Sequence, residues 1–321
     1  MKTAQVVYAF LLGLVLAPSC LGQESVVPAT PWQTETQRAL DSLGIKAAFR
    51  NKSYTLVIPE GEYEFVSLRI PKNVSLIASP TTTRSVRLRY VGTGDSTLVT
   101  LQGYGSRFSG FDLIAKDQKD PRLVGVKVDK ALNAEVDRIR FAHYGVDTQG
   151  IVIAGQESIT VQKCEFRCSV PVSYVWGDNV VFRDMDIGGA TSAESLASMN
   201  DQFPSAVVWL QGIPNQVVFD GSQTWQGCAH AIFGEIDSQQ TGQNFNIYHL
   251  RYEQTMTAAD KATPAVDLKF ADRGFENLVF VGCRWTDRVN GFDISGPPNR
   301  FVPRVTIIGS RMPGTRSGIS E

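Results

Sequence analysis

A strand-like segment returns eight times along this chain, and this repetition limits the folds open to it. The eight copies, among them VVFRDMDI and LVFVGCRW, begin at residues 106, 134, 159, 180, 217, 245, 278 and 305. Apolar and polar residues alternate in each copy, as in a half-buried strand. A strand pattern that recurs about every 20 to 50 residues is typical of stacked repeats, none of which buries its apolar face alone.

A second run of alternating residues precedes each copy, beginning at residues 97, 123, 150, 170, 205, 231, 264 and 290. Strands this short bury their apolar faces in register when the chain coils and equivalent strands stack in parallel. The sequence therefore predicts one all-β domain, a parallel β-helix (solenoid) over residues 23–321. Two long polar gaps, 188–204 and 253–264, are expected to be loops on its binding face.

A short capping helix is expected before the first repeat. Residues 34–43 (TETQRALDSL) hold apolar residues at helical spacing, and Thr34 or Thr36 is the expected N-cap. Gly44 is expected to end the helix. Because the end of a solenoid needs a protective cap, this helix is predicted to cover the first coil.

The first 22 residues are typical of an export signal, with Lys2 at the start, an apolar run over 6–16 and small residues near a cleavage site. The run is too short to span a bilayer, and no later stretch approaches about 20 apolar residues. No transmembrane segment is predicted, and the protein is expected to be secreted, periplasmic or at the cell surface. A lipid anchor at Cys20 is an alternative, because the residues before it resemble a bacterial lipoprotein box.

The balance of charges argues against nucleic acid as a partner. The chain has 31 Lys and Arg against 32 Asp and Glu, which leaves no basic footprint for nucleic acid.

Cys164 and Cys283 occupy equivalent places in their repeats and are expected to be buried; the other two cysteines after the signal are Cys168 and Cys228. A local disulfide or metal half-site at Cys164 and Cys168 is an alternative, although no CxxC motif supports it.

Stacking brings outward side chains of successive repeats into columns about 4.8 Å apart. The segments FGEID, VDLKF and GFDIS place Glu235, Asp267 and Asp293 at comparable positions. Two carboxyl groups are the minimum for glycoside hydrolysis, so Asp267 and Glu235 are the expected acid/base pair. Lys269 is expected to neutralise a substrate carboxylate, and Asp293 or Asp237 to assist. The alternative is that these charges serve solubility.

Aromatic residues on the same face suggest contacts with sugar. Trp209 and Tyr174 fall at outward positions of earlier strands, and flat rings stack on sugars. His230 precedes the strand of Glu235 and is a candidate substrate contact. On another face we expect a solvated column of mixed charge, made of Arg140, Arg251, Arg284, Arg311, Asp112, Glu165, Asp186 and Gln223.

The helix, the segment YTLVIPEGEYEFVSLRIPKNVSLIAS and repeated units such as GDNVVFRDMDIGG together resemble the pectate-lyase-like, right-handed parallel β-helix superfamily, over roughly residues 32 to 312. The resemblance implies activity on a polysaccharide, because the superfamily holds polysaccharide lyases, glycoside hydrolases, epimerases, esterases and non-catalytic adhesins. It does not single out one of these classes.

Family motifs test the enzyme classes. RVNGFDISG is similar to the NTDGFDI-type segment of polygalacturonase-like hydrolases, but Asn290 stands where those have a catalytic Asp. The segment 300–304 (RFVPR) has the residue types of the pectate-lyase motif in another order. We expect a hydrolase; the alternatives are a lyase that uses Lys269 with calcium held by carboxylates, and a non-catalytic carbohydrate-binding protein.

Overall fold

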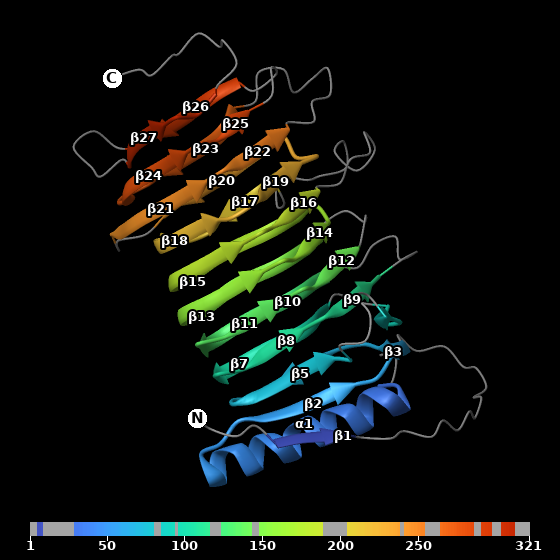
Figure 1. Ribbon diagram of the computed structural model, residues 1–321. Helices are drawn as coiled ribbons and strands as arrows, with labels where there is room; N and C mark the ends of the chain where they lie inside the picture. Colours follow the sequence, from blue (N-terminus) through green and yellow to red (C-terminus); the bar gives the residue numbers. More distant parts are fainter. Residues whose placement is uncertain are drawn as a thin grey trace.

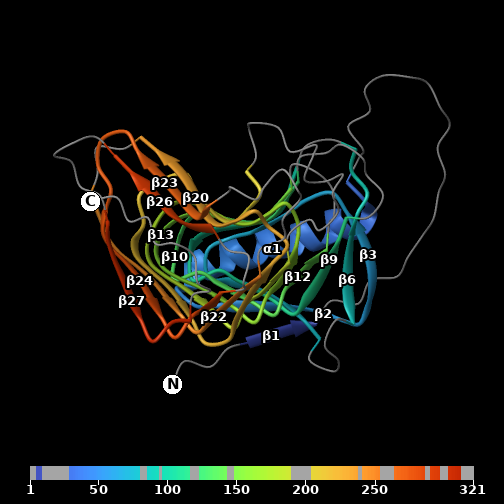
Figure 2. The ribbon, with the colours of Figure 1, turned by 90° about the horizontal axis from the view of Figure 1, so that it is seen from above.

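The structure, a computed structural model, describes residues 29–79, 85–93, 96–115, 123–142, 148–188, 204–237, 241–253, 264–285, 290–296 and 303–311, together with the backbone of 5–8. In these residues the chain winds as a right-handed coil whose parallel strands stack from one end of the molecule to the other (Figure 1). Seen from above, the strands form three walls around an interior (Figure 2). The parallel β-helix predicted from the repeats is confirmed.

Each coil passes through the three walls in turn. The first wall contains β4 (Leu68–Ile70), β7 (Ser96–Tyr104), β10 (Leu123–Leu132), β17 (Ala206–Leu210), β20 (His230–Ile236), β23 (Pro264–Phe270) and β26 (Asn290–Ser295). The second wall contains β2 (Tyr54–Ile58), β5 (Val74–Ala78), β8 (Arg107–Ser109), β11 (Glu135–Asp137), β18 (Asn215–Asp220), β21 (Gly242–Tyr248), β24 (Phe275–Val281) and β27 (Arg304–Ile308). Two long strands, β13 (Gln149–Gln162) and β15 (Val170–Arg183), run through both walls. The third wall contains β3 (Gly61–Phe65), β6 (Val86–Tyr90), β9 (Phe111–Ile114), β12 (Arg140–Ala142), β14 (Glu165–Arg167), β16 (Asp186–Gly188), β19 (Gln223–Gln226), β22 (Leu250–Glu253) and β25 (Arg284–Trp285).

The eight repeated segments each turn a corner, where the sequence predicted one strand. A residue with positive φ follows the second-wall strand in every coil from β8 onward: Gly110, Arg138, Lys163, Asp184, Gly221, His249, Gly282 and Gly309. A single left-handed residue turns the chain into the third wall within one or two residues. Soon after the corner the next inward side chain, such as Cys164, is buried again. The alternation of apolar and polar residues therefore continues across the corner, and the sequence pattern does not show the bend.

Apolar side chains stack from coil to coil and fill the interior. The rings of Phe182 and Phe219 lie face to face with centroids 4.4 Å apart, and Phe245 follows at 5.6 Å from Phe219. Trp225 and Trp285 point inward and are buried. Burial of such rings contributes about 25 cal/mol per Å² of apolar surface, which makes this stack the main source of cohesion between coils.

All four described cysteines are buried free thiols. Cys164 and Cys283 lie just after the corner, which confirms that they are small core residues, and burial raises the pKa of Cys164 to about 12. Cys168 is a free thiol, not bonded to Cys164, and burial raises its pKa. The local disulfide considered for Cys164 and Cys168 is therefore not found.

α1 (Pro31–Arg50) covers the first coil, as expected, but it is longer than the predicted helix at both ends. Thr30 caps its start, since the Thr30 hydroxyl accepts a hydrogen bond from the Gln33 amide at 3.2 Å. Thr34 and Thr36 lie inside the helix. The prediction missed the cap because apolar spacing begins a turn later than the helix does.

Gly44 does not end the helix, which continues to Arg50 and is capped by Asn51, where φ is 49°. A Cβ on Gly44 would lie 2.8 Å from Cγ of Pro71, so glycine here permits close packing against the coil. Side-chain amides of α1 also pair with the chain at β4. Gln37 Oε1 accepts from the Arg69 amide at 2.8 Å, and Gln37 Nε2 donates to the Arg69 carbonyl at 2.9 Å. These bonds protect an edge that would otherwise expose its backbone.

The N-terminal segment is described only in part. The backbone of β1 (Gln5–Tyr8) pairs in parallel with β2. Cys20 and the expected cleavage sites lie outside the described residues, so export and lipid attachment stay predictions. Within the described ranges no helix is long and apolar enough to cross a membrane.

Candidate functional site

Near the C-terminal end of the coil, the outward face of the first wall carries the predicted acids. In the stack of β17, β20, β23 and β26, Trp209 lies opposite Phe233, Phe233 opposite Asp267, and Asp267 opposite Asp293. We call these four residues the aromatic–acid column. The polar gaps 188–204 and 253–264 lie in sequence between a third-wall strand and the next first-wall strand, and their interiors lie outside the described residues.

Glu235 does not belong to this column, which corrects one prediction. The register pairs Glu235 with Lys269 and places Phe233 opposite Asp267. The error came from aligning the segments by their acids, whereas the buried apolar residues before them determine the register. Phe233 was missed for the same reason. Glu235 and Asp267 still lie on one wall, two residues out of step.

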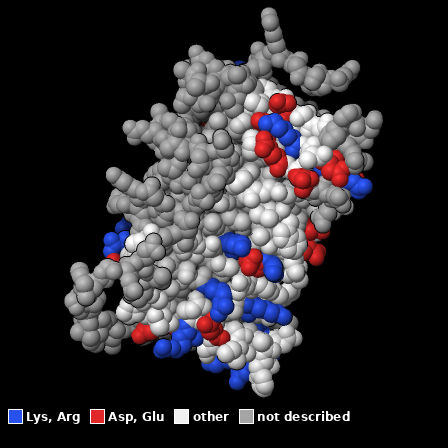
Figure 3. All heavy atoms as spheres, turned by 180° about the vertical axis from the view of Figure 1, so that it is seen from behind, with Lys and Arg blue, Asp and Glu red and all other residues white. Residues whose placement is uncertain are grey.

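Lys269 joins the two columns. Its Nζ lies 3.2 Å from Oε1 of Glu235 and 4.0 Å from Oδ1 of Asp267. The hydrogen bond to Glu235 and the charge of Asp267 raise the pKa of Lys269. The ammonium is therefore protonated in neutral solution and already has two carboxylate neighbours. Figure 3 shows acidic and basic atoms gathered near the C-terminal end of the molecule.

Asp267 is the most enclosed of these acids. Its side chain is 13% exposed, against 63% for Glu235, and its Oδ1 is buried without a hydrogen-bond partner. Burial raises the pKa of Asp267; Lys269 and His230 lower it, and the charges of Asp293 and Glu235 raise it again. The net shift is upward, which favours the protonated form that a general acid needs.

His230 lies beside the aromatic–acid column; its contact with substrate stays a prediction. Its Nδ1 lies 2.8 Å from the carbonyl oxygen of Pro264. A carbonyl only accepts, so Nδ1 carries a proton. The imidazole also contacts the ring of Phe233, with centroids 5.2 Å apart. His230 is therefore held beside the aromatic surface and close enough to Asp267 to lower its pKa.

Tyr174 is not part of this surface, contrary to the prediction. It pairs with the inward Leu210, whereas Ser173 is the residue beside Trp209. The Tyr174 hydroxyl donates to the carbonyl of Gly177, accepts from the Asn215 amide at 3.3 Å, and has its pKa raised to about 12, chiefly by burial. The alternation of β15 places Ser173 outward and Tyr174 inward.

Metal ligands do not gather at this site. Across the described ranges, no group of three His, Cys, Asp or Glu side chains is placed to hold a metal ion. The carboxylates of Glu235 and Asp267 already face the Lys269 ammonium, whose positive charge opposes a calcium ion beside them. Calcium at this site stays a prediction. Asp237 is exposed just after β20.

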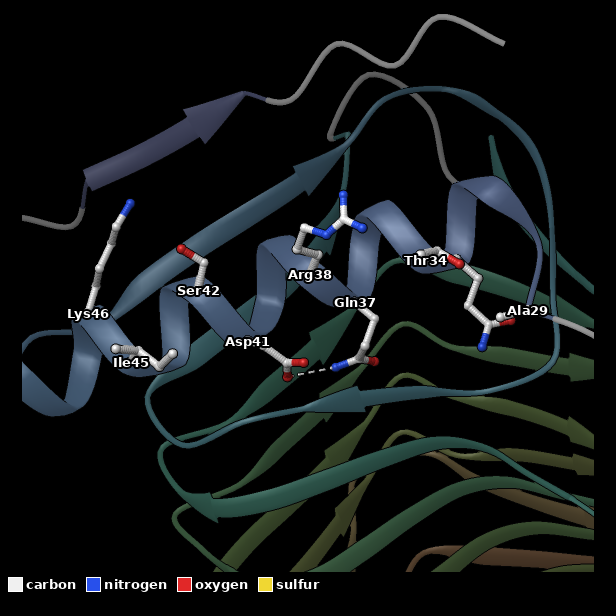
Figure 4. A pocket seen from close by; sticks show the side chains of 9 residues that line it. Ala29, Thr34, Gln37, Arg38, Asp41, Ser42, Ile45 and Lys46 are labelled. Atoms are coloured by element: carbon white, nitrogen blue, oxygen red, sulfur yellow. Dashed lines mark hydrogen bonds between the residues drawn. The ribbon is translucent and has the colours of Figure 1, made fainter. Parts of the chain in front are cut away.

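A pocket of about 700 Å³ lies at the opposite end of the coil, along α1. Its lining includes one carboxylate, Asp41, which accepts a hydrogen bond from Gln37 at 3.0 Å (Figure 4) and lies 3.5 Å from Arg69. The pocket therefore lacks the paired acids of the first wall.

Comparisons with known proteins identify the fold. No protein-family model matches the chain. No characterised protein matches it in sequence. Among solved structures, a double mutant of the tailspike protein of E. coli bacteriophage HK620 superposes with a TM-score of 0.55 at 11% identity, over 88% of this chain and 63% of the tailspike. This chain thus spans less than two thirds of that protein.

Two enzymes show a weaker likeness. The exopolygalacturonase of Thermotoga maritima has a TM-score of 0.44 at 11% identity, over 87% of this chain and 88% of its own. An iota-carrageenase in complex with iota-carrageenan fragments has a TM-score of 0.45 at 10% identity, over 88% and 84%. The likeness to the tailspike shows the fold alone: a right-handed parallel β-helix, which is the fold that the sequence resemblance implied.

Proposed function

We propose that this protein binds a polysaccharide along the first wall, outside the cell, and cleaves it by hydrolysis. One observation carries the proposal: in a single column, the rings of Trp209 and Phe233 lead in register to the carboxylates of Asp267 and Asp293. Aromatic rings bury the apolar faces of sugars, and paired carboxyl groups cleave glycosidic bonds. The shared fold supports a polysaccharide ligand, but residue roles come from this column alone.

The column also suggests a division of roles. Asp267, with its proton favoured, donates to the leaving oxygen, and Asp293 on the next coil attacks the sugar. Positions one coil apart are separated by about 4.8 Å. This is closer to the separation of about 5 Å in retaining enzymes than to the 6.5–9.5 Å, roughly, of inverting ones. We therefore infer that hydrolysis retains the configuration of the anomeric carbon. In this division of roles, Glu235 positions Lys269.

The charges at the site favour a neutral sugar. Glu235, Asp267 and Asp293 surround one lysine, and that lysine already contacts two of them. A uronate would bring a further negative charge to an acidic surface. Lys269 is thus poorly placed to neutralise a substrate carboxylate. Lyase action is disfavoured for a second reason, because a raised pKa keeps Lys269 protonated when a base is required.

Asp267→Asn tests the proposal, with the protein incubated on neutral and acidic polysaccharides. We expect wild type to release reducing ends from a neutral glycan. The variant should lower the rate by about 100-fold or more while glycan affinity is kept, because a general acid contributes on that scale. Asp129→Asn is the matched control, since Asp129 is an outward acid of the same wall paired with Lys127 at 3.4 Å.

The products separate the alternatives. Unsaturated, ultraviolet-absorbing ends would indicate a lyase. Retention of glycan without products, weakened by Trp209→Ala, would indicate a non-catalytic binding protein, the second candidate that the half-buried outward rings favour. Equal rates for wild type and Asp267→Asn would remove Asp267 from the mechanism.

A further inference from the structure

A column of polar and charged residues runs along the outward face of the third wall. In register from coil to coil, it contains Asp112, Arg140, Glu165, Asp186, Thr224, Arg251, Arg284 and Arg311. The sequence predicted this column with one error. Gln223 is inward and buried, and Thr224 takes its place.

The two halves of the column differ in charge balance. Arg140 lies 3.5 Å from both Asp112 and Glu165, so its charge is compensated on either side. The last three coils instead carry Arg251, Arg284 and Arg311 in succession, and all three are exposed.

Within the described ranges the last two arginines have no ion pair. Arg251 has one, with Glu253 on its own strand. Like charges on neighbouring strands are destabilising. We call the three guanidinium groups of Arg251, Arg284 and Arg311 the arginine ladder. They form a row along the coil axis in which Arg251 is partly compensated by Glu253, whereas Arg284 and Arg311 have no carboxylate partner among the described residues.

We propose that the arginine ladder binds a linear anionic polysaccharide, with carboxylates of successive sugars facing successive guanidinium groups. Guanidinium pairs with carboxylate through two parallel hydrogen bonds, and the coils repeat the arginine about every 4.8 Å. The ladder is one residue wide, which suits a linear chain and not a flat lipid surface. It lies on a different wall from the aromatic–acid column, so it is a separate site that anchors the protein to an acidic glycan.

Binding of alginate oligomers of one, three and six sugars to the whole protein tests the proposal. We expect the hexamer to bind more tightly than the monomer and to weaken as salt rises, because exposed charge pairs are screened. The triple variant Arg251→Gln, Arg284→Gln, Arg311→Gln should lose roughly tenfold or more in hexamer affinity. The matched control replaces three arginines that have carboxylate partners, Arg69, Arg89 and Arg138, and should stay within about twofold.

Three results would contradict the proposal that the arginine ladder binds an anionic polysaccharide. These are equal losses in the two triple variants, no dependence on oligomer length, or tighter binding of a short RNA than of alginate. Circular dichroism checks that both variants fold. Cleavage of neutral glycan should be unchanged in the ladder variant, so failure of this proposal and failure of the hydrolase proposal give different results.

Discussion

Asp267 occupies an outward position on β23, yet only 13% of its side chain is exposed. The half-buried ring of Phe233 precedes it in the column, and Lys269 lies two residues further along the same strand. Water reaches the carboxyl group poorly, so its charged form is disfavoured even with an ammonium 4.0 Å away. An aspartate at an outward strand position normally contributes to solubility. Here its surroundings make Asp267 a candidate general acid.

The same environment predicts a pH-dependent stability. Because the pKa of Asp267 is raised on folding, the native state binds more protons than the unfolded state, and this contribution is lost as pH rises through the folded pKa. Asp267→Asn should therefore raise Tm at pH 7, and the gain should vanish below about pH 4, near the unfolded pKa. Calorimetry at both pH values, with Asp129→Asn as control, measures this. A variant less stable than wild type at pH 7 would contradict it.

Among the elements, α1 is matched to one surface of the coil. Leu40, Leu43 and Ala47 are buried toward the first strands, and the Gln37 amide pairs with the backbone of Arg69. The helix thus supplies both the apolar cover and the hydrogen bonds that an end coil lacks. Its length follows from this contact, not from helix propensity, since it runs through Gly44.

Gly44→Ala should destabilise the protein, although alanine is the better helix former. Propensity favours the change by about 1 kcal/mol. The new methyl group would lie 2.8 Å from Cγ of Pro71, and this overpacking should cost about 1–3 kcal/mol of stability. We expect the overpacking to outweigh the gain in helix propensity, so that the variant is less stable. Urea unfolding measures the net change, with the exposed Ser42→Ala as control. A more stable Gly44→Ala variant would show that Pro71 moves aside freely.

As a whole, the molecule is close to one-dimensional. Among the strands that the structure describes, each coil pairs only with the coils before and after it, and the core is a stack of inward rings and aliphatic side chains. Stability in such a structure is approximately a sum of coil and interface contributions. The first-wall acids and the arginine ladder share the same few coils near the C-terminal end, on different walls.

This architecture predicts that damage at one end stays local. Leu40→Ala empties a fully buried position between α1 and the first coil, which should cost about 2–5 kcal/mol there. Amide hydrogen exchange should become faster in β2 to β5 and stay unchanged in β20 to β27. Phe49→Ala, at a side chain that is 90% exposed, is the control. A uniform increase along the chain would show one cooperative unit instead.

Local patterns in the chain were enough to predict the coil, the capping helix and buried residues such as Cys164 and Cys283, because alternation and period are read within a few residues. They also identified Asp267, Asp293 and Lys269 as outward neighbours. These features follow from the need of every short strand to bury one face.

Packing between coils determined the features that local sequence patterns did not predict. Coils differ in length because their loops differ, so counting residues could not show that Phe233, and not Glu235, lies opposite Asp267. The left-handed corners, the inward turn of Tyr174 and the passage of α1 through Gly44 likewise depend on contacts between segments distant in sequence. Register is chosen by which apolar side chains stack, and that choice exists only once the coils lie against one another.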